Sequence, residues 1–283
     1  MKKLSLLFIL LFAAGINLTH ASGKVIKVLA IGNSFSDDAA EVYLDDLARG
    51  GQVKMIIGNM YIGGCSLERH WNNAVEGLSD YSYRKIDLAG NRVVEEHKSL
   101  EEAIVDEEWD YITFQQASHF SGVYATYMPY LTDLLSYVKA RAKKPDVQFA
   151  FHITWAYAKT STHAGFLTYN KDQLVMFDAI VDAAHRATSK AGIELLIPSG
   201  PAIQYARESE LGDNFCRDGY HLNDLGKFTA ACVWYETLTG NPVIENPFKL
   251  AQATEAEDRI AKESAHRAIR HTKQLQEKVN STF

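Results

Sequence analysis

Residues 24–37 read KVIKVLAIGNSFSD, and the rest of the chain is organised around this stretch. Its first half is a β-branched apolar run of strand length, which is typical of a buried central strand in a parallel sheet. The run ends at Gly32, where the backbone turns without steric penalty, and Ser34 follows before a helical pattern from Asp38 to Arg49. This order places the Ser34 hydroxyl at the carboxyl edge of the sheet, where open α/β sheets bind ligands. A serine that only caps the helix would give the same pattern.

The chain beyond this stretch alternates between strand-like and helix-like segments. Strands are expected at 24–32, 52–60, 109–118, 147–153 and 193–198, and helices at 38–49, 66–75, 99–108, 126–142, 169–191, 202–210 and after 223. This alternation predicts one α/β domain over residues 22–283, with three αβα layers and a five-stranded parallel sheet. Outside the sheet, a small antiparallel ribbon is expected at 81–86 and 92–95. A charged helix at 253–279 is expected to pack across the domain or to bind a partner.

The first 21 residues have the pattern of a secretory signal peptide. Two lysines precede an apolar run over 4–16, and the small residues of a cleavage site end at Ala21. The apolar run is too short to span a bilayer comfortably, and no cysteine near its end would take a lipid anchor. We therefore expect an exported protein, periplasmic or secreted, with no membrane anchoring.

The charge and motif content exclude several classes of partner. Acidic residues outnumber basic ones, 35 to 29, which argues against nucleic acid as a partner. No glycine-rich phosphate loop is present, and the histidines at 70, 119, 152 and 163 fit no metal-binding motif. We therefore expect no cofactor and no metal. The oligomeric state stays open.

A second polar stretch, residues 215–222, follows the last predicted strand and therefore also lies at the carboxyl edge. It holds Asp218 and His221, which are three residues apart and can face the same way on a turn. The carboxylate can then accept a hydrogen bond from imidazole Nδ1–H, which leaves Nε2 free to take a proton from a hydroxyl. A cap or a surface turn is the alternative for this pair alone. Together with Ser34, it indicates a serine nucleophile with its two helpers.

The cysteines do not form a disulfide framework. Cys232 lies on the apolar face of a predicted helix and is expected in the core. Cys65 and Cys216 lie on two loops that the predicted fold brings together, so either a bridge or two free thiols fits the sequence.

In three blocks, the sequence resembles the SGNH hydrolase superfamily, the GDSL-type esterases. The blocks are Gly32-Asn33-Ser34-Phe35-Ser36, the pair Gly63-Gly64, and Asp218-Gly219-Tyr220-His221-Leu222. The blocks and the predicted strands follow the order of that superfamily from about residue 24 to 240. The resemblance implies a flavodoxin-like SGNH hydrolase fold and carboxylic-ester hydrolysis.

Carried over by position, the resemblance implies a role for each block. Ser34 would be the nucleophile, His221 the general base and Asp218 its orienting acid. The backbone N–H groups of Ser34 and Gly64 would stabilise the oxyanion. The third donor would be Gln115, with Gln116 and Ser118 as alternatives and a structural amide as a further one.

Two departures from the superfamily pattern stand out. Asn33 occupies a position where aspartate is usual, and a glutamine block at 115–116 replaces the usual Gly-x-Asn-Asp. In this the sequence is similar to a bacterial branch of the superfamily. Trp155 and Trp71 follow or neighbour strand ends at the site and are candidates for stacking on a sugar ring, with core packing as the alternative.

The expected function is therefore an exported serine esterase that removes O-acyl groups, most simply acetyl, from a glycan. A lipid or thioester acyl hydrolase is the alternative among enzymes. A glycan-binding protein that keeps the fold without turnover is the alternative from another class, because of the two departures.

Overall fold

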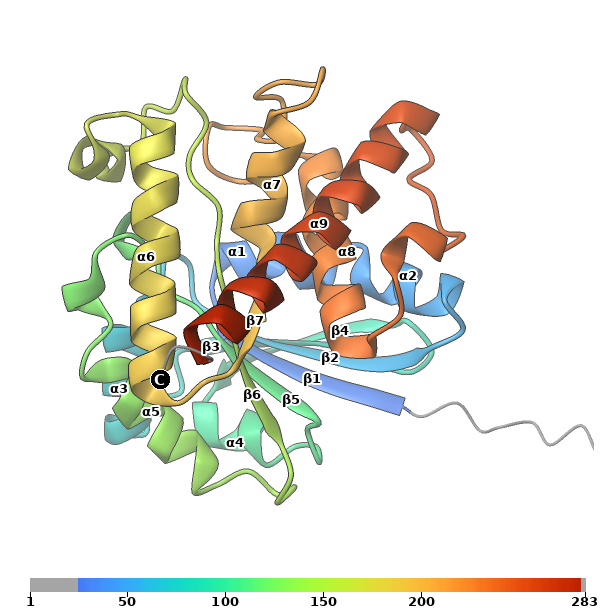
Figure 1. Ribbon diagram of the computed structural model, residues 1–283. Helices are drawn as coiled ribbons and strands as arrows, with labels where there is room; N and C mark the ends of the chain where they lie inside the picture. The colour runs from blue at the N-terminus through green and yellow to red at the C-terminus, as the bar shows by residue number, and fades with distance from the viewer. Residues whose placement is uncertain (1–24, 281–283) are drawn as a thin grey trace, which may run out of the picture.

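The structure is a computed structural model that describes residues 25–280. The expected signal peptide, residues 1–21, lies outside the described residues. A seven-stranded sheet runs through the domain in the order β4-β3-β2-β1-β5-β6-β7 (Figure 1). Its strands are β1 (Val25–Gly32), β2 (Lys54–Tyr61), β3 (Tyr81–Ile86), β4 (Arg92–Lys98), β5 (Tyr111–Phe114), β6 (Gln148–His152) and β7 (Leu195–Ile197).

The stretch that opens the described chain forms the middle of this sheet, as predicted. β1 pairs in parallel with β2 on one side, from Val25 opposite Lys54 to Gly32 opposite Tyr61. On its other side it pairs in parallel with β5, and β5, β6 and β7 continue in parallel. The carboxyl ends of these strands therefore meet at one edge.

The prediction of a five-stranded sheet is wrong. β3 and β4 form an antiparallel hairpin, and β3 joins the sheet by pairing antiparallel with β2, with Ile86 opposite Ile57. The ribbon was expected at these residues but outside the sheet. It joins the sheet because β3 buries Tyr81, Tyr83 and Ile86, and pairing also covers the edge that β2 would otherwise expose.

Helices cover both faces of the sheet. They are α1 (Ser34–Ser36), α2 (Leu44–Gly50), α3 (Leu67–Glu76), α4 (Leu100–Ile104), α5 (Tyr130–Lys139), α6 (Gln173–Ala191), α7 (Ser199–Arg207), α8 (Asp224–Thr239) and α9 (Glu255–Asn280). Figure 1 shows α2, α7, α8 and α9 together on one side, with α3, α4 and α5 across the sheet from them. The long α6 contacts both α5 and α7. The layers are those of the predicted αβα arrangement.

The helix after Ser34 differs from the prediction of one helix at 38–49. A short turn, α1, is followed by a π-helix, η1 (Asp37–Glu41), before α2 begins at Leu44. The chain starts to coil earlier because the Asn33 side chain accepts a hydrogen bond from the backbone N–H of Phe35 and so caps α1. The π-helix turns the Asp38 and Glu41 carboxylates into the protein, where both are buried.

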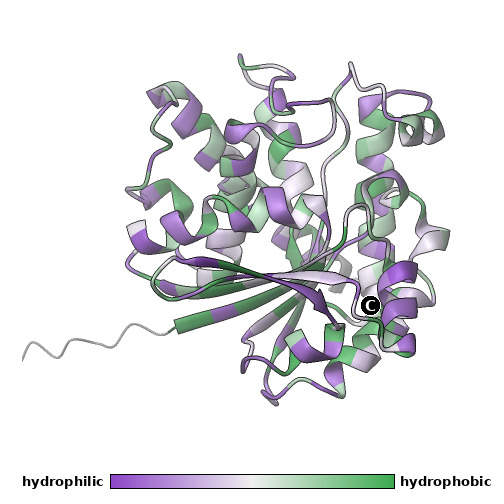
Figure 2. Ribbon diagram, turned by 180° about the vertical axis from the view of Figure 1, so that it is seen from behind, coloured by the Kyte–Doolittle hydropathy of each residue, from purple (hydrophilic) through white to green (hydrophobic). Residues whose placement is uncertain are grey.

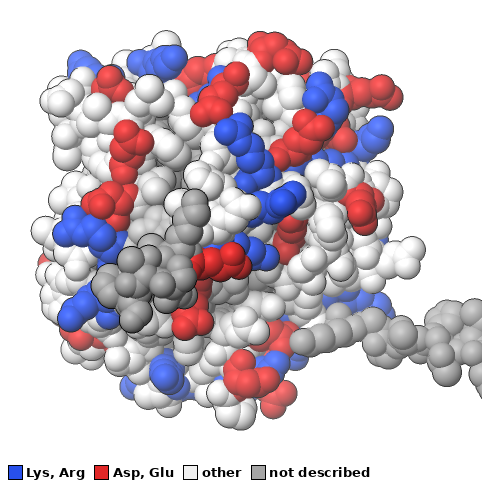
Figure 3. Space-filling view, in the orientation of Figure 1, with Lys and Arg blue, Asp and Glu red and all other residues white. Residues whose placement is uncertain are grey.

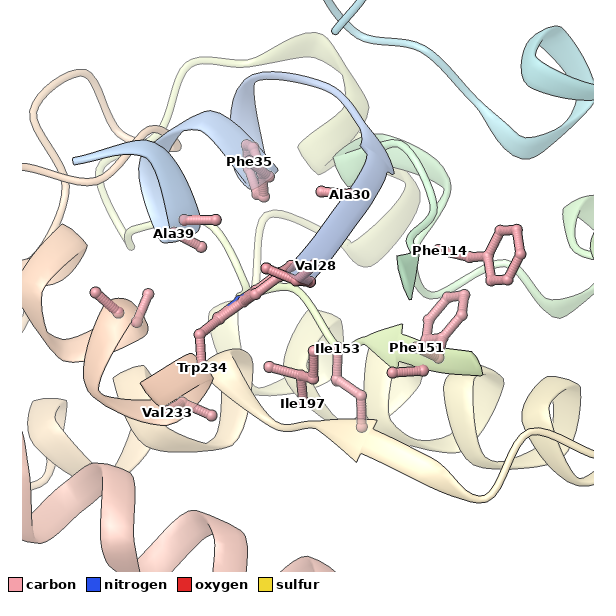
Figure 4. Close-up of a cluster of buried hydrophobic side chains, with 14 of the residues drawn as sticks. Val28, Ala30, Phe35, Ala39, Phe114, Phe151, Ile153, Ile197, Val233 and Trp234 are labelled. Carbon is pink, nitrogen blue, oxygen red and sulfur yellow. The ribbon is translucent and has the colours of Figure 1, made fainter. Parts of the chain in front are cut away.

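The core lies between the sheet and its helices. Figure 4 shows Trp234 of α8 reaching toward Val28 of β1 and, separately, Phe114 and Phe151 side by side on β5 and β6. In Figure 2 most of β1 is hydrophobic, whereas the helices carry bands of both kinds, as expected for elements with one buried face. The long α9 buries an apolar stripe that includes Ile260 and Ala265 and packs on α7 and α8.

The surface in Figure 3 carries acidic and basic side chains interspersed, without a wide region of one sign. Within residues 25–280, no helix is both long enough and apolar enough to cross a membrane.

Candidate active site

The structure brings Ser34, His221 and Asp218 together at the carboxyl edge of the sheet. Nε2 of His221 lies 2.9 Å from Oγ of Ser34, and Nδ1 of the same ring lies 2.7 Å from Oδ2 of Asp218. We call these three residues the triad. Partial burial raises the pKa of Asp218, but hydrogen bonds from the side chain and backbone of His221 outweigh it, so the pKa is lowered. Asp218 is therefore an ionised acceptor for the imidazole.

The loop that carries Asp218 and His221 is a small closed turn. Its ends pair through a β-bridge between Cys216 and Leu222, and the backbone N–H of Arg217 donates to the His221 carbonyl at 2.9 Å. The second carboxylate oxygen of Asp218 accepts the backbone N–H of His221 at 2.8 Å. This Asx-type turn sets the distance between carboxylate and imidazole locally, which explains the three-residue spacing.

A buried carboxylate, Asp38, attaches this loop to the segment after Ser34. Its Oδ1 pairs with the Arg217 guanidinium at 2.8 Å, and its Oδ2 accepts the backbone N–H of Leu222 at 2.8 Å. Burial raises the pKa of Asp38, whereas the bonds from Arg217 and Leu222 act in the opposite direction. Asp38 thus fixes the position of His221 relative to Ser34, and sequence reasoning missed it.

Beneath Ser34, a chain of three buried amide and imidazole groups links β1, β5 and β6. The Asn33 side chain donates to the Cys65 carbonyl at 3.0 Å, and its Oδ1 accepts from Phe35 N–H at 2.9 Å and from Gln115 Nε2 at 2.7 Å. Oε1 of Gln115 lies 2.9 Å from Nδ1 of His152. Asn33, Gln115 and His152 are each about 1% exposed.

The hydrogen-bond partners of Asn33 decide which amide atoms donate and which accept along this row of hydrogen bonds. A carbonyl can only accept and a backbone N–H can only donate, so Nδ2 of Asn33 faces Cys65 and Oδ1 faces Phe35. The Gln115 atom nearest Oδ1 must then be a donor, and Oε1 must face His152. Burial lowers the pKa of His152 to about 3, so the ring is neutral and carries its proton on Nδ1.

A second buried network holds the turn from the other side. The Ser36 hydroxyl donates to Oδ1 of Asn59 at 2.9 Å, and Nδ2 of Asn59 donates to Glu41 at 2.5 Å. Glu41 pairs in turn with Arg92 of β4 at 2.5 Å. The hairpin β3–β4 is therefore fastened to the segment that carries Ser34. Gly32 is needed here because a Cβ would lie only 2.4 Å from the Ser36 hydroxyl oxygen.

Gly64 lies at the exposed turn after β2 and has the left-handed φ of +63° that favours glycine. No acceptor among the described residues takes the backbone N–H of Gly64 or of Ser34. Both groups are thus available to a developing oxyanion. The roles of oxyanion donors stay predictions for Ser34, Gly64 and Gln115.

The three candidates for the third oxyanion donor, Gln115, Gln116 and Ser118, differ in how many of their hydrogen-bonding groups already have a partner in the protein. Gln116 donates to the Thr126 carbonyl at 3.0 Å and accepts from the N–H of Leu67 at 3.1 Å, so its amide ties loops together. The Ser118 hydroxyl bonds the Tyr157 hydroxyl at 2.8 Å. Gln115 adjoins Asn33 and keeps a second N–H on Nε2, which Asn33 does not use.

The structure places the two tryptophans that were expected to stack on substrate in the core or against it. Trp155 is completely buried, stacks on Phe35 with ring centroids 4.2 Å apart, and donates to the Tyr220 carbonyl at 2.8 Å. Trp71 is partly buried and packs against the core. The packing alternative therefore describes Trp155, whose ring supports the triad from below. The position of an aromatic residue after a strand end does not tell, from sequence alone, whether the ring packs in the core or stacks on a substrate.

Cys65 and Cys216 are free thiols, so no bridge joins the two loops. Burial raises the pKa of Cys65 to about 12 and that of Cys216 to about 11. Among the described residues, no group of three His, Cys, Asp or Glu side chains is arranged to hold a metal ion.

The fold that holds this site is similar to that of two solved proteins, one described as a candidate hydrolase and one as an esterase. A candidate SGNH hydrolase from Slackia heliotrinireducens is 21% identical, with a TM-score of 0.51, over 76% of this chain and 99% of that protein. An acetylxylan esterase from Geobacillus stearothermophilus is 11% identical, with a TM-score of 0.50, over 77% and 95% of the two chains. At these identities the likeness is one of fold: the chain shares the fold of the candidate SGNH hydrolase.

The chain belongs to the family described as a domain of unknown function, DUF4886, which it matches over residues 27–268. A crystal structure of a DUF4886 family protein from Bacteroides uniformis is 46% identical, with a TM-score of 0.85, over 87% of this chain and 95% of that one. No curated protein sequence matches the chain.

Proposed function

We propose that this protein is an exported serine esterase that removes O-acyl groups, most simply acetyl, from a glycan. One observation carries the proposal: Nε2 of His221 is 2.9 Å from the Ser34 hydroxyl while Nδ1 is 2.7 Å from the Asp218 carboxylate. Those two contacts are what a serine needs to lose its proton to a base that is held in one tautomer.

The reaction follows from these contacts. Oγ of Ser34 attacks the ester carbonyl carbon as its proton passes to Nε2 of His221, and the backbone N–H groups of Ser34 and Gly64 stabilise the oxyanion, with Gln115. When the bond to the alcohol oxygen breaks, that oxygen takes the proton from Nε2. Water then attacks the acyl-serine through the same base, which releases the acid and restores the Ser34 hydroxyl.

The substrate part of the proposal is supported by a protein of the same fold and by the predicted export. A structural neighbour of the same fold is an acetylxylan esterase, and the leader pattern at 1–21 would export the enzyme to where glycans are met. A short acyl group is favoured because the turn beside the proposed oxyanion site consists of the exposed Gly63 and Gly64, which carry no side chains to line an apolar channel.

The test is hydrolysis of p-nitrophenyl acetate by the purified protein and by Ser34→Ala. We expect hydrolysis by the native protein, loss of it in the variant, and labelling of Ser34 by a fluorophosphonate probe. A panel of O-acetylated polysaccharides, with acetate release as the readout, then identifies the glycan. Glycan binding without any Ser34-dependent release would instead identify a non-catalytic binding protein, and preference for long acyl or thioesters a lipid or thioester hydrolase.

A further inference from the structure

The protein surface beside the triad is formed by the rings of tyrosine and histidine side chains. The Tyr220 ring lies against His221 with centroids 4.1 Å apart, and His163 lies at a steep angle to Tyr220 at 4.8 Å. Tyr157 is behind them, 4.9 Å from His163. Tyr157 is buried whereas Tyr220 and His163 are half-buried, so two rings border the site.

These rings have fixed places because two segments are bonded together. The backbone N–H of Ala158 donates to the Gly219 carbonyl at 2.8 Å, and the Trp155 indole donates to the Tyr220 carbonyl at 2.8 Å. The loop that carries His163 is thus attached to the loop that carries His221. A surface held in this way needs little ordering when a ligand binds.

The proton on His163 is also placed by the backbone. Nδ1 accepts the N–H of Gly165 at 3.0 Å, so the neutral ring carries its proton on Nε2. No acceptor among the described residues takes the Nε2–H group. Partial burial, and then the nearby His221, lower the pKa of His163, so the ring is neutral near pH 7.

The chemistry decides which half of an ester meets these rings. The leaving alcohol must receive its proton from Nε2 of His221, so the alcohol oxygen has to approach that ring. The carbonyl oxygen points instead to the N–H groups of Ser34 and Gly64. The body of the alcohol is therefore expected on the His221 side, where the Tyr220 ring contacts His221 and His163 contacts Tyr220.

We propose that Tyr220 and His163 form the subsite for the alcohol half of the ester and select a neutral, hydroxylated ring. The Tyr220 ring offers a face for stacking, and Nε2–H of His163 donates to a hydroxyl near the ester. This inference rests on the proposed esterase function. It assigns sugar recognition to these two residues in place of Trp155, which has no exposed surface.

A matched pair of substrates tests the proposal. Cyclohexyl acetate and the monoacetate of cyclohexane-1,2-diol differ by one hydroxyl group next to the ester. In His163→Ala, the ratio of kcat/KM for the hydroxylated ester to that for cyclohexyl acetate should fall about fivefold, the worth of one neutral hydrogen bond. His163→Gln keeps an N–H donor and should recover part of the ratio. Tyr220→Leu should lower kcat/KM for both ring esters more than for ethyl acetate.

The control is His271→Ala, which changes a histidine that contacts Tyr205 on α7 and should leave the ratio unaltered. If the ratio is the same in His163→Ala as in the native protein, the subsite is wrong even though Ser34-dependent hydrolysis continues. If Ser34→Ala hydrolyses both esters at the native rate, the esterase proposal itself fails. A circular dichroism spectrum close to that of the native protein shows that each variant is folded, so the rates can be compared.

Discussion

The side-chain amide of Asn33 donates a hydrogen bond to the backbone carbonyl of Cys65 at 3.0 Å. This contact joins the turn that carries Ser34 to the turn that carries Gly64, and so holds two of the three proposed oxyanion donors at a fixed separation. It also gives a reason for asparagine where the resembled pattern has aspartate, because a carboxylate could not donate to that carbonyl.

We therefore expect Asn33→Asp to lower stability and turnover. The Cys65 carbonyl would lose its donor and face a carboxylate, at a cost of about 1–3 kcal/mol in the free energy of unfolding. Urea unfolding and p-nitrophenyl acetate kinetics measure the two effects. A variant as stable as the native protein and equally active would show that the Cys65 contact is dispensable.

Gln115→Ala should reduce kcat about a hundredfold with little change in KM, because an oxyanion donor acts mainly on the transition state. Gln115→Glu should be slower still, since a carboxylate would face both the oxyanion and Oδ1 of Asn33. Gln116→Ala is the matched control and should lower thermal stability rather than kcat, because its amide bonds Thr126. Full turnover in Gln115→Ala, with a loss in Gln116→Ala or Ser118→Ala, would assign the donor differently.

Ser34→Ala and His221→Ala should each lower kcat by several orders of magnitude, and the double variant should be no worse than either. The reason is that nucleophile and base act as one unit. Pre-steady-state and steady-state rates of ester hydrolysis give the comparison. Losses that add in the double variant would mean that the two residues act independently.

Asp38→Asn should slow turnover by about ten- to a hundredfold while substrate still binds, because one of its two contacts to the His221 loop is lost and the base shifts from its place. Asp37→Asn is the control, since Asp37 is adjacent and pairs instead with Arg84 at 3.3 Å. The measurement is the separate effect on kcat and on KM. Equal effects from both substitutions would remove the positioning role.

The protein should lose stability as the pH falls from about 6.5 toward 3. Burial lowers the pKa of His70 and that of His152 to about 3 each, whereas an unfolded histidine has a pKa of about 6.5. Between those values the unfolded chain binds more protons, so each buried histidine removes up to about 1.4 kcal/mol per pH unit of acidification.

His70→Gln should show a smaller loss of unfolding free energy between pH 7 and pH 5 than the native protein shows. Chemical denaturation at the two pH values measures it, and the difference within each protein cancels the direct cost of the substitution. An unchanged loss would mean that His70 does not contribute to the acid sensitivity.

Local signals in the sequence predicted the parts of the molecule that depend on neighbouring residues. The apolar run of β1 identified the central strand, and the helices expected at 66–75 and after 223 begin at Leu67 and Asp224, where Ser66 and Asn223 cap them. The three-residue spacing of Asp218 and His221 likewise predicted a contact that is made within one turn.

What the sequence left open depends on partners far along the chain. Asp38 forms an ion pair with Arg217, which is 179 positions further along the chain, and no local sequence pattern predicts that contact. Trp155 could equally have faced solvent or the core, because an amphipathic ring suits both. The hairpin at 81–98 was expected as a ribbon, but whether it would join β2 depended on a sheet edge that only the fold defines.

The 187 positions that separate Ser34 from His221 also order events during synthesis. Ser34 leaves the ribosome early, whereas Asp218 and His221 come on the loop before α8, after all seven strands of the sheet have been made. A growing chain therefore carries Ser34 without its base, and the proposed hydrolysis could begin only once the chain has been made and folded beyond His221. If the chain is exported unfolded, as we propose, that delay would keep the proposed activity absent until the protein has crossed the membrane.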